Sequence, residues 1–256
     1  MKTWLLGCLL LLANVSSNAN VEQIHIATDG GWLPYYNDVG ASPPGFVTEI
    51  IEAIWPSVRY SQVPYARAIT MAEAGLVDAV IVVNIDQGRL LKAPESIAPY
   101  SISLLVPHEQ AELAKQGADG WLQLRIGLGR GYEPTSDQGA FGAYARAVQG
   151  SERMVVLSGS QIQSSAVRMI QAGRLDALLE GTEYLYYWRQ QQGWEARYAI
   201  VEVGSSVPQY LGFYPSKRGE QLRDVFSAGM QRLRRSGELQ IILDRYGIQD
   251  WQPLVQ

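Results

Sequence analysis

Cysteine is almost absent from this sequence: its 256 residues contain one, Cys8, which lies in an apolar run close to Met1. Residues 20–256 therefore offer no thiol for a disulfide bridge or a thiolate metal site. Histidine is nearly as scarce, and His25 and His108 lack the short spacing of a metal-binding pair. We therefore expect neither a metal nor a cofactor.

Long hydrophobic runs are also missing, except for one near the start of the chain. Residues 4–13 are apolar, Lys2 precedes them, and residues 17–19 are of the kind that a signal peptidase reads. This pattern predicts a signal peptide over residues 1–19. The run is shorter than the roughly 20 residues that span a bilayer, and Cys8 lies too early in it for a lipoprotein signal. We expect a periplasmic product without stable membrane insertion.

Charge of one sign is not in large excess. Lys and Arg number 21 and Asp and Glu number 25, which gives a formal net charge of −4. This mildly acidic balance argues against nucleic acid or an anionic membrane as the main partner. Phe is scarce, with four residues, whereas the chain has seven Trp and fourteen Tyr. Such amphipathic aromatics suit a binding site with one apolar and one wet end. The expected partner is a small-molecule ligand, and the expected state is a monomer.

Residues 64–89 combine a helix, a turn, a strand and a polar end. Apolar residues at near-helical spacing predict a helix that ends at Gly75, and the β-branched run 77–83 is typical of a strand buried in a parallel sheet. In open α/β sheets, ligands bind beyond the carboxyl ends of the strands. The candidate ligand-binding residues there are Asn84, Asp86 and Arg89. The Arg89 guanidinium can bind a carboxylate through two parallel hydrogen bonds, or it can pair with Asp86 in an ordinary turn.

The core of this unit occurs twice, as AGLVDA at residues 74–79 and as AGRLDA at residues 172–177. One helix–turn–strand unit used twice predicts an α/β fold with two lobes built on one plan, and two copies at so long a period are not a solenoid array. Stretches rich in β-formers near Ser101 and Val203 can cross between the lobes. We expect lobe one to hold residues 20–104 and 207–256, and lobe two to hold residues 105–206.

Two loops carry further candidates. Trp32 and Tyr35 lie on the loop after the first expected strand, where aromatic side chains can form a platform for a ligand. The alternative for each is a place in the lobe's own core. The segment GLGRGYEP lacks the third glycine of a dinucleotide loop, so it predicts a tight turn whose N–H groups can face an anion. Its candidate residues are Gly131 and Tyr132.

The order of these motifs resembles that of family 3 extracellular solute-binding proteins, which include the periplasmic polar amino-acid receptors of ABC importers. The matching pieces, in order, are Asp29 to Tyr35, Gly45-Phe46, Asp78-Ala79, Arg89 and Ala98-Pro99-Tyr100. The resemblance implies a type II periplasmic binding fold, with a mixed sheet flanked by helices in each lobe and the ligand between the lobes. It also implies that Arg89 binds the α-carboxylate of the ligand, while Trp32 or Tyr35 stacks on its side chain. The PYARA segment resembles a subgroup of the family and adds Arg67.

Two positions depart from the pattern of that family. Asp86 stands where the family usually has Thr, and it can neutralise Arg89. The amine-binding acid of the family usually stands at the position of Gly181, whereas this chain has Glu180 one residue earlier and Glu183 two residues later. A shift of one residue along a strand turns the side chain to the other face. Glu180 is therefore the amine partner if the strand ends or bends there, and Glu183 is the alternative.

The resemblance implies a binding protein that closes on a small polar solute, an amino acid or a related carboxylate, and presents the closed form to an ABC permease. Two other functions stay open. Cyclohexadienyl dehydratases resemble the same family, although we expect no enzyme here because the chain lacks a G-x-S-x-G motif, a metal-spaced His pair and a Cys after residue 19. An exported sensory module would close on its ligand in the same way and signal to a membrane kinase.

Overall fold

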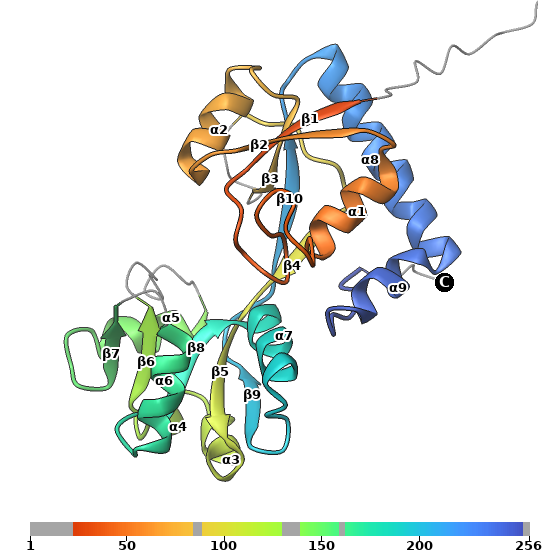
Figure 1. The fold of residues 1–256 in the computed structure, drawn as a ribbon. Helices are drawn as coiled ribbons and strands as arrows, with labels where there is room; N and C mark the ends of the chain where they lie inside the picture. Colours follow the sequence, from red (N-terminus) through yellow and green to blue (C-terminus); the bar gives the residue numbers. More distant parts are fainter. Residues whose placement is uncertain (1–22, 84–88, 130–138, 159–161, 253–256) are drawn as a thin grey trace, which may run out of the picture.

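The chain folds into two lobes, each built on a five-stranded mixed sheet (Figure 1). The computed structural model describes residues 23–83, 89–129, 139–158 and 162–252. The sheet of lobe one has the strand order β2-β1-β3-β10-β4. Its strands are β1 (Ile24–Thr28), β2 (Val58–Gln62), β3 (Ala79–Val83), β4 (Ala98–Tyr100) and β10 (Val207–Phe213).

Helices cover both faces of this first sheet. One face packs against α1 (Phe46–Ile54), α8 (Lys217–Ser236) and α9 (Glu238–Asp244), and the other packs against α2 (Tyr65–Glu73). The alternation in β1 explains this arrangement, because successive side chains of a strand point to opposite faces. Ile24 and Ile26 belong to the core under α1 and α8, whereas Ala27 belongs to the core under α2.

Lobe two repeats this layered plan with the strand order β7-β6-β8-β5-β9. Its strands are β5 (Ile102–Pro107), β6 (Ile126–Gly129), β7 (Met154–Leu157), β8 (Ala177–Gly181) and β9 (Tyr198–Glu202). One face packs against α3 (Ala111–Ala114), α4 (Ala118–Trp121) and α5 (Ala140–Ala147), with a 3₁₀ turn at His108–Gln110 before them. The other face packs against α6 (Ile162–Gln171) and α7 (Thr182–Gln192).

The fold class expected from the sequence is confirmed: two mixed sheets flanked by helices. The two AG-x-x-DA units form α2–β3 in lobe one and α6–β8 in lobe two. The long helical segment near the C-terminus is divided at Gly237 into α8 and α9. Gly237 has a φ of 78°, a left-handed conformation that glycine adopts without the steric cost of a Cβ.

Two segments join the lobes. Ser101 alone separates β4 from β5, and residues 203–206 lead from β9 to β10. The backbone N–H groups of Val203 and Gly204 both donate to the carbonyl of Ile102, at 3.0 and 3.2 Å, so the two crossing segments are bound to each other. The expected lobe boundary at residue 104 lies inside β5, which pairs in the second sheet from Ile102 onward.

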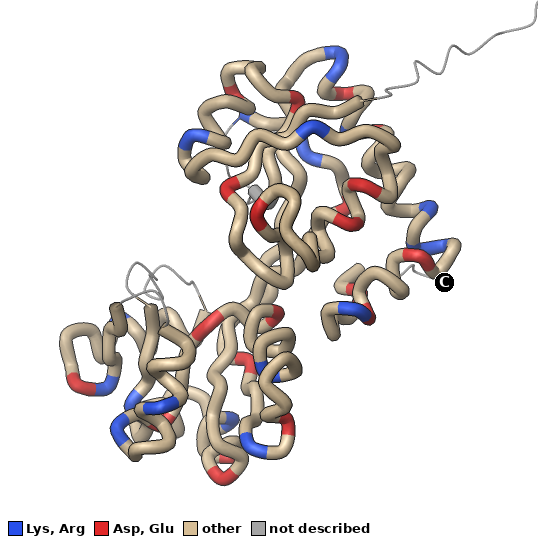
Figure 2. The backbone as a smooth tube through the Cα atoms, viewed as in Figure 1, with Lys and Arg blue, Asp and Glu red and all other residues tan. Residues whose placement is uncertain are grey.

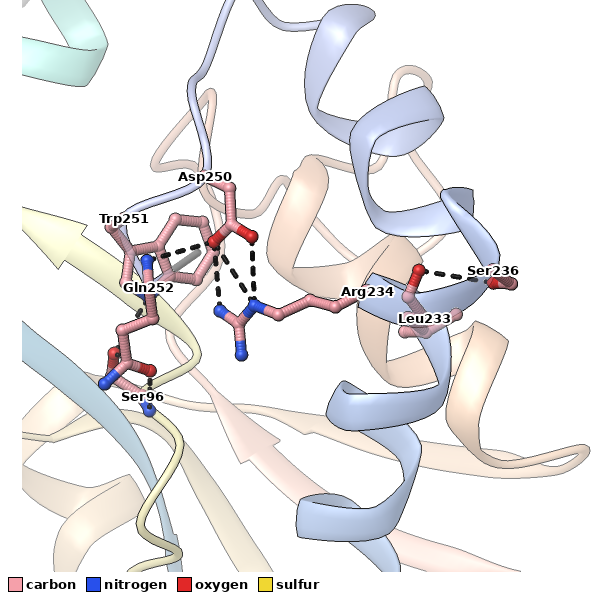
Figure 3. A network of polar contacts seen from close by, with 7 residues as sticks. All are labelled: Ser96, Leu233, Arg234, Ser236, Asp250, Trp251 and Gln252. Atoms are coloured by element: carbon pink, nitrogen blue, oxygen red, sulfur yellow. Dashed lines mark hydrogen bonds and ion pairs between the residues drawn. The ribbon is translucent and has the colours of Figure 1, made fainter. Parts of the chain in front are cut away.

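The last described residues are bound to lobe one (Figure 3). The Arg234 guanidinium of α8 pairs with the Asp250 carboxylate at 3.0 Å. The Trp251 indole N–H donates to Ser96 Oγ at 2.8 Å, and the Ser96 backbone N–H donates to Gln252 Oε1 at 3.1 Å. Residues 250–252 therefore connect α8 to the segment that leads into β4.

Acidic and basic residues are interspersed along both lobes, and neither sign covers a whole lobe (Figure 2). Within the ranges that the structure describes, no helix combines the length and apolar character needed to cross a bilayer.

Candidate functional site

The register of the two sheets places the carboxyl ends of β3 and β8 on the sides of the lobes that meet. In lobe one, Val83 at the end of β3 lies opposite Tyr210, the middle residue of β10, which is the strand that the chain enters after it crosses from lobe two. In lobe two, Gly181 at the end of β8 lies opposite Ile102, the first residue of β5 after the other crossing. The loops that follow β3 and β8 therefore begin beside the crossing segments, which is where ligands bind in open α/β sheets.

The loop after β1 reaches the same edge, because β1 runs parallel to β3. Trp32 and Tyr36 exchange two backbone hydrogen bonds, of 2.8 and 3.0 Å, which close this loop into a tight turn. The Tyr36 hydroxyl donates to Asp29 Oδ1 at 2.7 Å, so Asp29 is held within lobe one. Burial and this bond to Asp29 raise the pKa of Tyr36 above its usual range.

Trp32 and Tyr35 form a stacked pair in this loop. Their ring centroids are 4.2 Å apart and their planes differ by 17°. Trp32 is partly exposed, and its ring lies 5.9 Å from that of Tyr100, the last residue of β4 before the crossing. Tyr35 is 0% exposed and packs 5.2 Å from the Phe46 ring in the core of lobe one. Of the two predicted platform residues, Trp32 has accessible surface, and Tyr35 adopts the core placement that the sequence left open.

Tyr35 also contacts lobe two. Its hydroxyl donates to Glu183 Oε2 at 2.6 Å, and Glu183 is 8% exposed. Burial raises the pKa of the Glu183 carboxyl, although the hydrogen bonds from Tyr35 and from backbone N–H groups oppose this. Burial and the adjacent Glu183 carboxylate raise the pKa of Tyr35 well above its usual range.

Glu180 and Glu183 occupy different environments. Glu180 lies within β8 and is partly exposed; Gln163 Nε2 donates to one carboxylate oxygen at 3.1 Å and the Gly181 backbone N–H donates to the other at 2.9 Å. Glu183 lies in the first turn of α7 and is bonded to Tyr35. Of these two acids, Glu180 is the one with accessible surface at the end of β8.

The remaining candidates of lobe one are cationic. Arg67 is exposed in the first turn of α2, which follows the carboxyl end of β2, and Arg89 is exposed beyond β3. Among the described residues, no ion pair involves either guanidinium. Four other candidates lie outside the described residues: Asn84, Asp86, Gly131 and Tyr132. The described part of the chain also contains no group of three or more His, Asp or Glu residues placed to hold a metal ion.

Neither a protein-family model nor a curated protein matches the sequence. Solved structures match the fold. A polar amino-acid ABC uptake transporter substrate-binding protein from Streptococcus thermophilus superposes with a TM-score of 0.66 and 18% identity, over 88% of this chain and 86% of the other. The chain has the fold of two-lobed periplasmic binding proteins.

Two further binding proteins have this fold. An amino-acid ABC transporter substrate-binding protein from Streptococcus pneumoniae, solved with L-arginine, has a TM-score of 0.59 and 14% identity, over 88% of this chain and 94% of its own. An ancestral amino-acid-binding protein, described as a precursor of cyclohexadienyl dehydratase, has a TM-score of 0.61 and 12% identity, over 88% of this chain and 95% of its own. These neighbours have the fold that the resemblance to family 3 solute-binding proteins implies.

The contact that the sequence did not predict is the one between Tyr35 and Glu183. The two residues are 148 positions apart, and neither belongs to a motif that pairs them. The sequence suggested Glu183 only as an alternative to Glu180 for binding the amino group of the ligand. The one available signal was an acidic residue in the first turn of an aromatic-rich helix, which does not distinguish a ligand contact from a contact between lobes.

Proposed function

We propose that the protein is a periplasmic solute-binding protein that closes on a small amino-acid-like carboxylate and presents the closed form to an ABC permease. The observation that carries this proposal is the placement of the carboxyl ends of β3 and β8 beside the two crossing segments. A ligand held between these ends contacts both lobes, so its binding energy favours the closed form. The amino-acid-binding neighbours with this fold support the same assignment.

In this proposal each lobe supplies a different kind of contact. Arg89, with Asn84 and Asp86 preceding it, binds the carboxylate from lobe one. Trp32 covers the apolar part of the solute, which suits its partly exposed ring beside Tyr100. From lobe two, Glu180 binds the amino group. Arg67 and Asp29 in lobe one, and Gly131 and Tyr132 in lobe two, complete the proposed site.

In this proposal the two segments that cross between the lobes form the hinge. Lobe one comprises the N-terminal and C-terminal parts of the chain, and lobe two the segment between them. Because Val203 and Gly204 are hydrogen-bonded to Ile102, the two crossing segments bend together. Closure then rotates one lobe against the other and leaves both cores intact.

The test is a thermal-shift screen of the purified protein lacking residues 1–19, with amino acids, small carboxylates, amines and sugars as probes. A ligand at about 100 times its dissociation constant stabilises the folded protein by about 2.7 kcal/mol. We expect a hit among the amino acids or carboxylates. Small-angle scattering with that ligand should show a smaller radius of gyration than without it. Stabilisation by sugars or amines alone, or a hit without compaction, would contradict the proposal.

Two alternative functions, a dehydratase and a sensory module, can be distinguished from the proposed one by other observations. A dehydratase is favoured by one neighbour, the ancestral protein described as a precursor of that enzyme. It requires turnover, which an absorbance assay detects because loss of water together with carbon dioxide from a carboxylated cyclohexadienol creates an aromatic ring. A sensory module binds and closes as an importer component does, but its gene should lie beside a kinase gene instead of permease and ATPase genes.

A further inference from the structure

One face of α7 contacts lobe one, although α7 belongs to lobe two. Glu183, Tyr187 and Gln190 are spaced at i, i+4 and i+7, so they lie on one side of the helix. Glu183 Oε2 accepts a hydrogen bond from the Tyr35 hydroxyl at 2.6 Å. The Tyr187 ring lies 6.0 Å from the ring of Tyr246, which follows α9.

The third residue of this face approaches the lobe-one backbone directly. A Cβ placed on Gly247 would lie 3.2 Å from Gln190 Oε1. The contacts of the face therefore extend from the loop after β1 to the segment after α9, over two turns of α7. Tyr184 and Trp188 stack on each other at 6.3 Å and pack in the core of lobe two, so the aromatic residues of α7 are divided between the lobes.

The first turn of α7 is also bound to a crossing segment. The Thr182 backbone N–H donates to the Ser101 carbonyl at 2.9 Å. The Thr182 hydroxyl lies 2.7 Å from both Ser101 Oγ and Ser103 Oγ, and all three side chains are buried. Because Glu183 is the next residue, its bond to Tyr35 lies close to the axis about which the lobes would turn.

We propose that this face of α7 is a third, non-covalent connection between the lobes, which sets their resting angle through the Tyr35–Glu183 hydrogen bond. A rotation that separates Tyr35 from Glu183 leaves a buried hydroxyl without its partner and removes one hydrogen bond from a buried carboxyl until water reaches them, and lost hydrogen bonds of buried groups are costly. Rotations that keep the bond carry no such cost. The bond therefore restricts the ligand-free protein to a narrow range of angles.

The same connection acts on Trp32. Its indole stacks on Tyr35, and Tyr35 is tied to lobe two, so the orientation of Trp32 depends on the position of lobe two. This consequence, unlike the resting angle, rests on the proposed function. In that function Glu183 is a positioning residue: it orients the aromatic contact without touching the solute.

The experiment measures the angle without any ligand, so its result is independent of the binding screen. Because residues 20–256 contain no Cys, Glu73→Cys on α2 and Gln171→Cys on α6 provide two spin-label sites, both exposed and in different lobes. Double electron–electron resonance then gives the distribution of interlobe distances. The variant is Tyr35→Phe, and the matched control is Tyr36→Phe. The control loses a buried hydroxyl of the neighbouring residue whose bond, to Asp29, stays inside lobe one.

We expect Tyr35→Phe to broaden and shift the distance distribution, and Tyr36→Phe to match the unmutated protein. Glu183→Ala should reproduce Tyr35→Phe, whereas Glu183→Gln, which keeps an acceptor oxygen, should stay close to the unmutated distribution. The proposal is overturned if Tyr35→Phe matches the unmutated protein, or if Tyr36→Phe broadens the distribution equally. If circular dichroism shows that Tyr35→Phe does not fold, the same distance measurement is made on Tyr187→Ala, which removes the next contact of this face. A distribution that matches the unmutated protein then overturns the proposal.

Discussion

Asp78 and Asp176 make the same pair of contacts in the two lobes. The Asp78 carboxylate accepts the backbone N–H of His25 at 2.9 Å, and the Asp176 carboxylate accepts that of Arg125 at 2.7 Å. Each also pairs with a guanidinium: Arg218 lies 2.7 Å from Asp78, and Arg125 lies 2.9 Å from Asp176. The repeated AG-x-x-DA motif thus has a structural basis. Its Asp directly precedes one parallel strand, and its carboxylate binds the backbone N–H near the start of the neighbouring parallel strand.

Asp176→Asn should lower the free energy of unfolding by about 1.5–3 kcal/mol, the usual worth of hydrogen bonds to a charged group. The Arg125 side chain holds the pKa of the Asp176 carboxyl below its usual range. The stabilisation is therefore present above the unfolded pKa and is lost as the pH falls through the folded one. Urea unfolding of both proteins at several pH values measures this difference. The exposed Glu152→Gln in the same lobe is the control, and a loss that is equal at neutral and strongly acidic pH would contradict the account.

Arg89→Ala should weaken binding of the ligand found in the screen by about 2–5 kcal/mol, because it leaves a carboxylate unpaired between the lobes. Arg89→Lys should also bind poorly, since it keeps the charge but loses the paired donors of the guanidinium. Calorimetry provides the measurement. The control is Arg174→Ala, an exposed arginine in the turn before β8, at the edge of lobe two away from the crossings. Unchanged affinity in Arg89→Ala would remove the central residue of the proposed site.

Asp86→Ala separates two roles of its carboxylate. If Asp86 neutralises Arg89, its removal should strengthen the binding of an anionic ligand or leave it unchanged, because the guanidinium is then available to the ligand alone. The same calorimetric titration measures this effect. Weaker binding would mean that Asp86 contacts the ligand itself, for example through an amino group.

The stability of the protein should fall with rising pH because of Glu183. Burial raises the pKa of this carboxyl in the folded state. Its contribution is complete below the unfolded pKa, about 4.3, and is lost as the pH rises through the folded pKa. Glu183→Gln should flatten this loss. Tyr35→Phe should extend this loss of stability to higher pH, because the Tyr35 hydroxyl donates a hydrogen bond that lowers the pKa of Glu183. Parallel stability curves for Glu183→Gln and the unmutated protein would exclude this role.

Export should remove residues 1–19 and leave Asn20 as the first residue, because the apolar run 4–13 and residues 17–19 fit a signal peptide. N-terminal sequencing of the secreted product from cells that express the full sequence tests this. A mature chain that begins at a lipid-modified Cys8 would show that the short apolar run serves as a lipoprotein signal.

The sequence predicted the fold well because the fold depends on local periodicity. The run 77–83, predicted as a buried strand, contains β3, and the division of the C-terminal helices at Gly237 follows from a conformation that glycine favours. The site was less predictable, because it depends on residues far apart in sequence. No pattern indicates that Tyr35 reaches Glu183 in the other lobe, or that Tyr187 turns away from Tyr184 and Trp188 to meet Tyr246. Helical spacing restricts which side chains share a face, but not which neighbour that face meets.

The position of β10 between β3 and β4 has a consequence for the order in which the chain can fold. Lobe two is a continuous segment, so its sheet can be complete once β9 is available for folding. Lobe one is discontinuous: β4 has no strand beside it in the sheet until β10 arrives, more than a hundred residues later in the sequence. Because domains generally fold as units, the second lobe of this protein can fold before the first one does. A chain available for folding only as far as residues 202–207 would then hold a folded lobe two tethered to an unfinished lobe one with exposed strand edges, a form open to proteolysis and aggregation.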